Sequence, residues 1–319
     1  MNPGRMSRPD VEADRSLAAE EARGVGAPEQ LLYRLEWHVI RRLDGLLQGD
    51  YRTLFYGYGV DLADLREYQP GDDIRYIDWN VTARMDAPYV RQYHEDRELT
   101  AWFLLDLSPS MDFGLWSRQK RNALIDFVAT VARLLTRHGN RVGAILYGDR
   151  VQQRIPAGGG RLQVLRLINE LLKQPRLPAA PFTDLSVLLT NALTVIKQRS
   201  LLFVVSDFIS AAGWERPLKL LSRRHEVLTI RLWDPCEREL PDIGLIVLQD
   251  AETGEQVTVD TSDRRFREAY QALARQREVE LAELFRRADV EPLALSTQED
   301  LVQAIVRFAA LRKQRRRHR

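Results

Sequence analysis

The feature that most constrains the fold is the segment at residues 100–111, in which an apolar run ends in the acid Asp106 and two serines follow. It reads Thr-Ala-Trp-Phe-Leu-Leu-Asp-Leu, and Ser-Pro-Ser-Met comes next. A run this apolar predicts a strand buried on both faces, the usual state of a strand in a parallel sheet. Ligand sites of open α/β sheets lie at the carboxyl ends of the strands, where Asp106, Ser108 and Ser110 stand. We therefore expect an oxygen-rich site at one edge of a parallel sheet.

Two later segments offer further oxygen ligands in a similar context. Thr183 stands where the chain enters an apolar helical stretch, and the apolar run 201–206 is followed by Asp207. Carboxylates and hydroxyls are hard ligands that suit Mg²⁺, which prefers near-octahedral oxygen coordination and keeps several waters. These residues together predict a metal site.

Beyond residue 106 the chain alternates between helical and strand patterns. Alternation of this kind predicts an α/β fold with a doubly wound, mostly parallel sheet, in which 151–156 is an antiparallel edge strand. A β-hairpin insertion near 240–260 interrupts the alternation, and a long charged helix at 263–288 follows it. The expected helices are 120–138, 162–173, 185–197, 218–223 and 301–311, and the expected strands are 141–147, 201–206, 226–232 and 292–295.

The chain divides into four segments by composition. An amphipathic stripe at 29–48 predicts a helix that packs on its own domain, with a partner or a membrane surface as the alternative. The basic end predicts a solvated tail, with RNA or an acidic partner as the alternative. The segments are a disordered lead at 1–28, an N-terminal helix and β-element at 29–98, the α/β domain with its hairpin at 99–311, and a basic tail at 312–319.

Composition excludes several classes of protein. The formal net charge of +2 over 319 residues gives no global electrostatic case for nucleic acid. A single cysteine, Cys236, excludes an intrachain disulfide and a cysteine-rich zinc site. No apolar stretch approaches the length that spans a bilayer, and the first residues lack the apolar core of a signal peptide. We therefore expect a cytoplasmic protein without a transmembrane segment.

A long charged motif occupies residues 65–84. It reads Leu-Arg-Glu-Tyr-Gln-Pro-Gly-Asp-Asp-Ile-Arg-Tyr-Ile-Asp-Trp and closes on Ala83-Arg84. By itself it predicts a rigid, salt-bridged β-element around a Pro-Gly turn. Followed by Asp106-x-Ser108-x-Ser110 and Met111, it resembles domain-of-unknown-function family 58 over roughly residues 30–310. Members of that family are von Willebrand factor type A-like proteins often associated with MoxR-type AAA+ ATPases.

The ordered series of Asp-x-Ser-x-Ser, loop Thr and strand-end Asp resembles the metal-ion-dependent adhesion site of type A domains. The resemblance implies that Ser108 and Ser110 bind Mg²⁺ directly, with Mn²⁺ or Ca²⁺ as other possible ions, and that Thr183 adds a third hydroxyl. Asp106 and Asp207 then act through metal-bound water. An ion held by neutral hydroxyls stays electrophilic and takes a carboxylate from a partner. The implied protein is a non-enzymatic adaptor that joins client proteins to a MoxR-type ATPase for remodelling or maturation.

The sequence also departs from the type A pattern. Many type A domains carry glycine beside the loop threonine and after the last aspartate, where this chain has Phe182 and Phe208. Both departures bear on the geometry of the loops and on metal affinity, less on the fold.

The same residues are compatible with structural roles and with a few enzyme classes. The plain alternative is that the serines and Thr183 cap helices while the two acids hold loops by hydrogen bonds. Phosphatases of the haloacid-dehalogenase-like type also place an Asp after a buried first strand, but Ser108 stands where they need a second Asp as general acid. Gly-x-Ser-x-Gly is absent, and the glycines at 158–160 lack the Lys-Ser/Thr ending of a P-loop. We therefore predict that the chain is not an enzyme.

Overall fold

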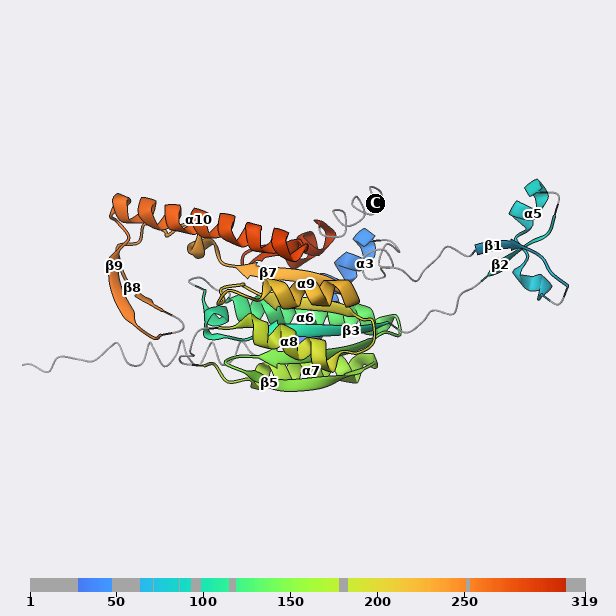
Figure 1. Ribbon diagram of the computed structural model, residues 1–319, viewed down its shortest axis with the longest axis horizontal. Coiled ribbons are helices and arrows are strands. Elements are labelled where there is room, and N and C mark those ends of the chain that lie inside the picture. The colour runs from blue at the N-terminus through green and yellow to red at the C-terminus, as the bar shows by residue number, and fades with distance from the viewer. Residues whose placement is uncertain are drawn as a thin grey trace, which may run out of the picture.

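The computed structural model describes residues 28–47, 64–70, 72–85, 87–92, 99–114, 119–177, 183–250 and 253–307. Its centre is a six-stranded sheet in the order β10-β7-β6-β3-β4-β5, with helices on both faces (Figure 1). All neighbouring pairs are parallel except β4 with β5, which are antiparallel. The predicted doubly wound, mostly parallel α/β sheet with an antiparallel edge is confirmed. The strands are β3 Thr100–Asp106, β4 Arg141–Tyr147, β5 Val151–Gly158, β6 Leu201–Ser206, β7 Glu226–Trp233 and β10 Pro292–Ser296.

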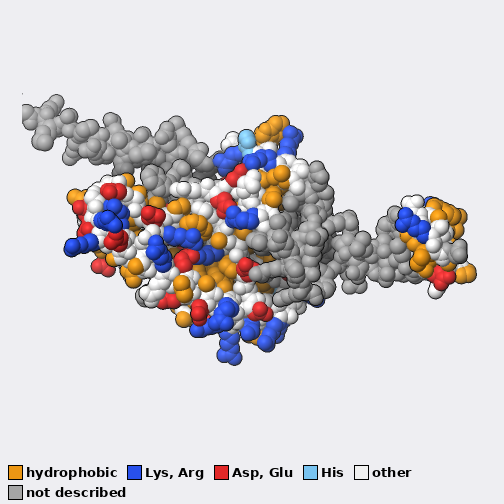
Figure 2. Space-filling model, turned by 90° about the horizontal axis from the view of Figure 1, so that it is seen from above, with side chains coloured by type: hydrophobic (Ala, Val, Ile, Leu, Met, Phe, Trp, Pro, Cys, Tyr) orange, Lys and Arg blue, Asp and Glu red, His pale blue; other side chains and the backbone are white. Residues whose placement is uncertain are grey.

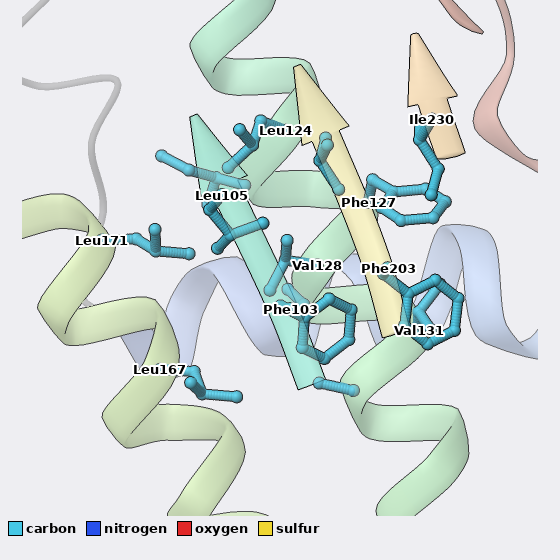
Figure 3. Packing of buried hydrophobic residues seen from close by; sticks show 14 of the residues in the cluster. Phe103, Leu105, Leu124, Phe127, Val128, Val131, Leu167, Leu171, Phe203 and Ile230 are labelled. Carbon is cyan, nitrogen blue, oxygen red and sulfur yellow. The ribbon is translucent and has the colours of Figure 1, made fainter. Parts of the chain in front are cut away.

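Residues 101–105 of the central strand β3 are all apolar because both faces of the strand are covered. Successive side chains of a strand point to opposite faces, so Phe103 and Leu105 enter one core while Leu104 enters the other. Phe103 stacks on its register partner Phe203 of β6, with ring centroids 5.0 Å apart. Figure 3 shows Phe103, Leu105 and Phe203 among side chains from neighbouring helices, such as Phe127 and Leu167. Each such fully buried side chain contributes about 1.5–3 kcal/mol through the hydrophobic effect.

One face of the sheet carries α6 (Lys120–Arg137), α7 (Gly160–Lys173) and the N-terminal helical segment. That segment comprises α2 (Pro28–Leu35), a π-helical turn η1 (Glu36–Ile40) and α3 (Arg41–Leu47), and its residues Leu32 and Leu43 are buried in the same core. The amphipathic helix predicted at 29–48 is therefore present and packs on the α/β domain.

The opposite face carries α8 (Leu185–Val195), α9 (Glu215–Arg224) and the long α10 (Arg264–Ala288). Between β7 and α10 lies the predicted hairpin, formed by β8 (Leu245–Gln249) and β9 (Gln256–Asp260) in antiparallel register. The hairpin and one end of α10 extend away from the sheet in Figure 1. Residues 301–307 form a last helical stretch, shorter than the predicted 301–311 because 308–311 lie outside the described residues.

The charged motif forms a small element of its own. Strands β1 (Asp64–Glu67) and β2 (Tyr89–Gln92) pair antiparallel, and the 3₁₀ turn η2 (Ile74–Tyr76) and α5 (Trp79–Met85) lie between them in the chain. Asp78 accepts a hydrogen bond from the Asn80 amide at the start of α5. The predicted β-element is thus present in this part of the chain, with an ion pair between Arg75 and Asp73.

Two predicted segments cannot be compared with the structure. Residues 1–27 of the predicted lead and the whole basic tail at 312–319 lie outside the described residues. The predicted domain boundaries stay predictions. Within the described residues, no helix has both the length and the apolar character needed to cross a membrane.

Candidate functional site

Asp106 lies at the carboxyl end of β3, between the ends of β6 and β4. Its side chain is fully buried. One carboxyl oxygen accepts a hydrogen bond from the Ser108 amide at 3.0 Å, and the other accepts one from the Ser206 hydroxyl at 2.6 Å. Ser206 is the last residue of β6, so Asp106 ties two neighbouring strand ends together.

The two predicted serines face each other directly after β3. Ser108 precedes the 3₁₀ turn η3 (Pro109–Asp112), and its hydroxyl oxygen lies 3.1 Å from that of Ser110. Both serines are buried, yet the Ser108 side chain makes no capping hydrogen bond to η3. The capping alternative is therefore wrong for Ser108. Met111, which follows, is fully buried in the core.

Asp207 follows β6 and shares the same edge of the sheet. One of its carboxyl oxygens accepts a hydrogen bond from the Ile209 amide at 2.9 Å. The next residue, Phe208, has φ of 59°, the left-handed conformation that glycine adopts freely and that costs other residues about 1–2 kcal/mol. Its ring packs on Phe285 and Trp214, at centroid distances of 4.7 and 5.1 Å. This packing offsets the backbone strain, so the loop reaches a glycine-like geometry without glycine.

Thr183 is buried before α8, but it does not cap that helix. The cap is Asp184, whose carboxylate accepts the Ser186 amide at 2.9 Å. The Thr183 carbonyl accepts hydrogen bonds from the Ala211 amide and the Ser210 hydroxyl, at 2.9 and 3.0 Å. These two residues belong to the loop that follows Asp207, so Thr183 is held against that loop. Phe182 lies outside the described residues.

Sequence reasoning missed a buried lysine that contacts Asp207. Lys120, the first residue of α6, is fully buried, and its ammonium donates to Asp207 at 2.6 Å and to Glu237 at 2.5 Å. Glu237 ends the 3₁₀ turn η4 (Pro235–Glu237) after β7, where its other oxygen accepts the Asp234 amide. One signal was available: α6 opens on two cations, against the helix dipole, and such cations need acidic partners. The second of them, Arg121, pairs with Asp112 at 3.3 Å.

Burial governs the protonation of this site. It raises the pKa of the Asp106 carboxyl to about 6, and the nearby charge of Asp207 acts in the same direction. Burial also raises the pKa of Glu237, although Lys120 opposes that effect. Burial lowers the pKa of the Lys120 ammonium, but the charges of Asp207 and Glu237 outweigh it and leave that pKa above its ordinary value. Lys120 is therefore a permanent cation at neutral pH.

The donor set fits a hard divalent cation. Among the described residues, no group of three or more His, Cys, Asp or Glu side chains is placed to hold a metal ion. A metal at this edge therefore depends on the hydroxyls of Ser108, Ser110 and Thr183, together with the two aspartates. These are all oxygen ligands, as Mg²⁺ requires.

Comparison with known proteins places the chain in a family. The sequence model of the family described as protein of unknown function DUF58 matches residues 64–280. The chain belongs to this family. Uncharacterized proteins of Mycobacterium tuberculosis and Mycobacterium bovis are each 36% identical to this DUF58 protein over 313 residues, which cover 98% of this chain and 95% of each relative.

Solved structures resemble this DUF58 protein more distantly. An aerotolerance-related membrane protein from Bacteroides fragilis and the conserved hypothetical protein BatB from Bacteroides thetaiotaomicron each match with a TM-score of 0.46 and 12% identity. Each alignment covers 68% of this chain and 99% of the other. These values are too low to transfer a site or an activity. The assignment to DUF58 confirms the family resemblance drawn from the charged motif and the Asp-x-Ser-x-Ser series.

Proposed function

We propose that this DUF58 protein is a non-enzymatic interaction module that binds Mg²⁺, or Mn²⁺ or Ca²⁺, and through that ion a carboxylate of a partner protein. The observation that carries the proposal is the meeting of buried oxygen ligands at one sheet edge: Asp106, Ser108 and Ser110 after β3, and Asp207 after β6. Thr183 is held against the loop after Asp207 through its carbonyl, and in this proposal its hydroxyl would be a further ligand.

The local charge supports a divalent ion. The carboxylates of Asp207 and Glu237 share one ammonium, that of Lys120, and Asp106 lies close enough to Asp207 for that charge to raise its pKa. When all three acids are ionised, these four side chains carry two excess negative charges, and only Glu237 among them is partly exposed. A divalent cation neutralises that excess, and burial strengthens the attraction because the local dielectric constant is low.

The arrangement supports recognition more than catalysis. Neutral hydroxyls that ligated the ion directly would leave it electrophilic, so that it would attract a carboxylate from a partner. A phosphatase of the haloacid-dehalogenase-like type is the second candidate, but it needs an acid at position 108. The Ser108 hydroxyl lies 3.1 Å from the Ser110 hydroxyl and cannot supply a proton as a carboxylic acid does.

The partner and the compartment belong to the same proposal. We infer that the carboxylate comes from a client protein or from a MoxR-type AAA+ ATPase, and that the module works as an adaptor in the cytoplasm. Nucleic acid is not the expected partner. In Figure 2, Lys and Arg side chains are interspersed with Asp and Glu over the face that includes α10, rather than gathered into a basic stripe.

Metal binding is tested first, by thermal unfolding in chelator and in Mg²⁺, Mn²⁺ or Ca²⁺. Ligand binding to the native state raises its stability, so the melting temperature of the wild type is expected to rise with the ion. The double variant Ser108→Ala/Ser110→Ala is expected to lose this rise, while Ser222→Ala, which removes a surface hydroxyl on α9, keeps it. Equal melting temperatures with and without metal in the wild type would count against the proposal.

Partner binding is tested second, with a purified MoxR-type ATPase from the same organism. Co-elution from a sizing column is expected in Mg²⁺ and not in chelator, and not with the double serine variant. Co-elution under all these conditions would place the contact elsewhere, first at the charged element of residues 64–92.

A further inference from the structure

The ammonium of Lys120 is bound to Asp207, one of the residues that we propose to serve the metal ion. It is fully buried and donates to Asp207 and Glu237 over 2.6 and 2.5 Å. A lysine loses much conformational freedom on burial and must give up its hydration. Two short charge-assisted hydrogen bonds compensate for both effects, so the position of the ammonium is specific.

Asp207 has both of its carboxyl oxygens engaged. The Ile209 amide donates to one oxygen and Lys120 donates to the other, over 2.9 and 2.6 Å. A divalent ion that uses Asp207, directly or through a bound water, must share the carboxylate with the ammonium. The two cations also repel each other across a poorly solvated space.

We propose that Lys120 is the resident cation of the site: it keeps the Asp207 loop in its binding geometry without metal and competes with the divalent ion for Asp207. The inference rests on the proposed metal-dependent function and deepens it, because it names the residue that sets the metal affinity. Lys120 is a positioning residue in this scheme, acting on the ion through Asp207. Glu237 moderates the competition, since it draws the ammonium partly away from Asp207.

The experiment is calorimetric titration of the folded full-length chain with MnCl₂ alone, in the wild type and in Lys120→Met. Methionine fills similar volume without charge. We expect Lys120→Met to bind Mn²⁺ at least about tenfold more tightly, because the repulsion between a unit charge and a divalent ion a few ångström away exceeds that amount at an effective dielectric constant of about 20. Arg121→Met is the matched control. It removes a cation from the same helix end but from a pair with Asp112, and we expect an affinity within about threefold of the wild type.

Glu237→Gln is expected to move the affinity in the opposite direction. With one carboxylate removed, the ammonium turns wholly to Asp207, and Mn²⁺ binding weakens by at least about threefold. Glutamine still offers an oxygen to the Asp234 amide, so η4 is retained. Opposite shifts in two variants of one cluster distinguish competition from a general loss of structure.

A second variant guards against misfolding of Lys120→Met. The double variant Lys120→Met/Glu237→Gln removes one cation and one anion, which keeps the net charge of the cluster. We expect it to bind Mn²⁺ at least about tenfold more tightly than Glu237→Gln alone. Equal affinities in these two proteins would overturn the inference.

The outcomes separate this inference from the proposed function. Tighter binding in Lys120→Met with no detectable binding in the wild type supports the competition and removes metal dependence from the native protein. Equal binding in both overturns the competition and leaves the proposed function standing. Binding in neither overturns both.

Discussion

Two clusters of three charges lie at or next to β7, and they differ in burial and in the sign of their net charge. The buried cluster, Lys120 with Asp207 and Glu237, has one cation and two anions, with side chains 0, 1 and 19% exposed. The surface cluster joins Glu278 of α10 to Arg231 and Arg238, so it has two cations and one anion, with side chains 30, 13 and 41% exposed. Glu237 and Arg238 are neighbours in the chain yet belong to different clusters.

The two glutamates show what the difference does. Burial raises the pKa of Glu237, although an ammonium lies beside it. Hydrogen bonding by Arg231 lowers the pKa of Glu278, with the charges of Arg231 and Arg238 adding to the effect. An excess of negative charge kept from water therefore attracts a further cation, whereas an excess of positive charge in contact with water is solvated. For this reason we consider only the buried cluster, of these two, as part of a cation-binding site.

Removing one cation from each cluster gives the largest expected contrast. Lys120→Met leaves two buried carboxylates without their partner and is expected to lower the free energy of unfolding by about 3–5 kcal/mol in chelator. Arg238→Met loses a half-exposed ion pair and its stacking on Trp233, and about 1 kcal/mol or less is expected. Urea unfolding at pH 7 measures both. Similar losses in the two variants would mean that burial does not distinguish the clusters.

The pH dependence of stability tests the effect of burial on Asp106, which lies next to the buried cluster. The folded-state pKa of Asp106 is about 6 against an ordinary 3.8, so between these values the native protein holds a proton that the unfolded chain has released. Stability from this group is therefore complete below about pH 4 and is lost as the pH rises through about 6. Asp106→Asn removes the effect.

The measurement is the difference in unfolding free energy between the wild type and Asp106→Asn, by urea in chelator at several pH values. The wild type is expected to lose about 2–3 kcal/mol relative to the variant between pH 4 and pH 7. A difference that does not change with pH would show that Asp106 is not desolvated in the folded protein.

The residues of the candidate site that follow strands could be predicted from sequence. Asp106 and Asp207 each follow an apolar run that forms a strand covered on both faces, so their positions at one sheet edge follow from strand pattern and parallel topology. Ser108 comes with Asp106 because it is two residues away. The pattern around Thr183 predicts only that it stands where the chain enters a helix, and the resemblance to type A domains added its role as the third hydroxyl.

The contact between Lys120 and Glu237 could not be predicted from the strand pattern. They are 117 residues apart, and the register of α6 against the end of β7 decides that they meet. The lysine stands in a helix that is predictable from its apolar stripe, but its burial depends on the tertiary arrangement. Phe208 illustrates the same limit. Its sequence suggests a loop unlike that of type A domains, yet the packing of Trp214 and Phe285 stabilises the left-handed conformation.

The smallest expected effect comes from Glu278→Gln in the surface cluster, and its sign is the decisive part. The folded-state pKa of Glu278 lies below its ordinary 4.5, so the stability it contributes is present above that value and is lost as the pH falls through the folded-state pKa. Because the pair is partly exposed, less than about 1 kcal/mol is expected. The free energy lost in the variant should therefore be greatest near pH 7 and shrink towards pH 3, opposite to the trend for Asp106. If urea unfolding gave the same sign for both carboxylates, the contrast between a dry, anion-rich cluster and a wet, cation-rich one would fail.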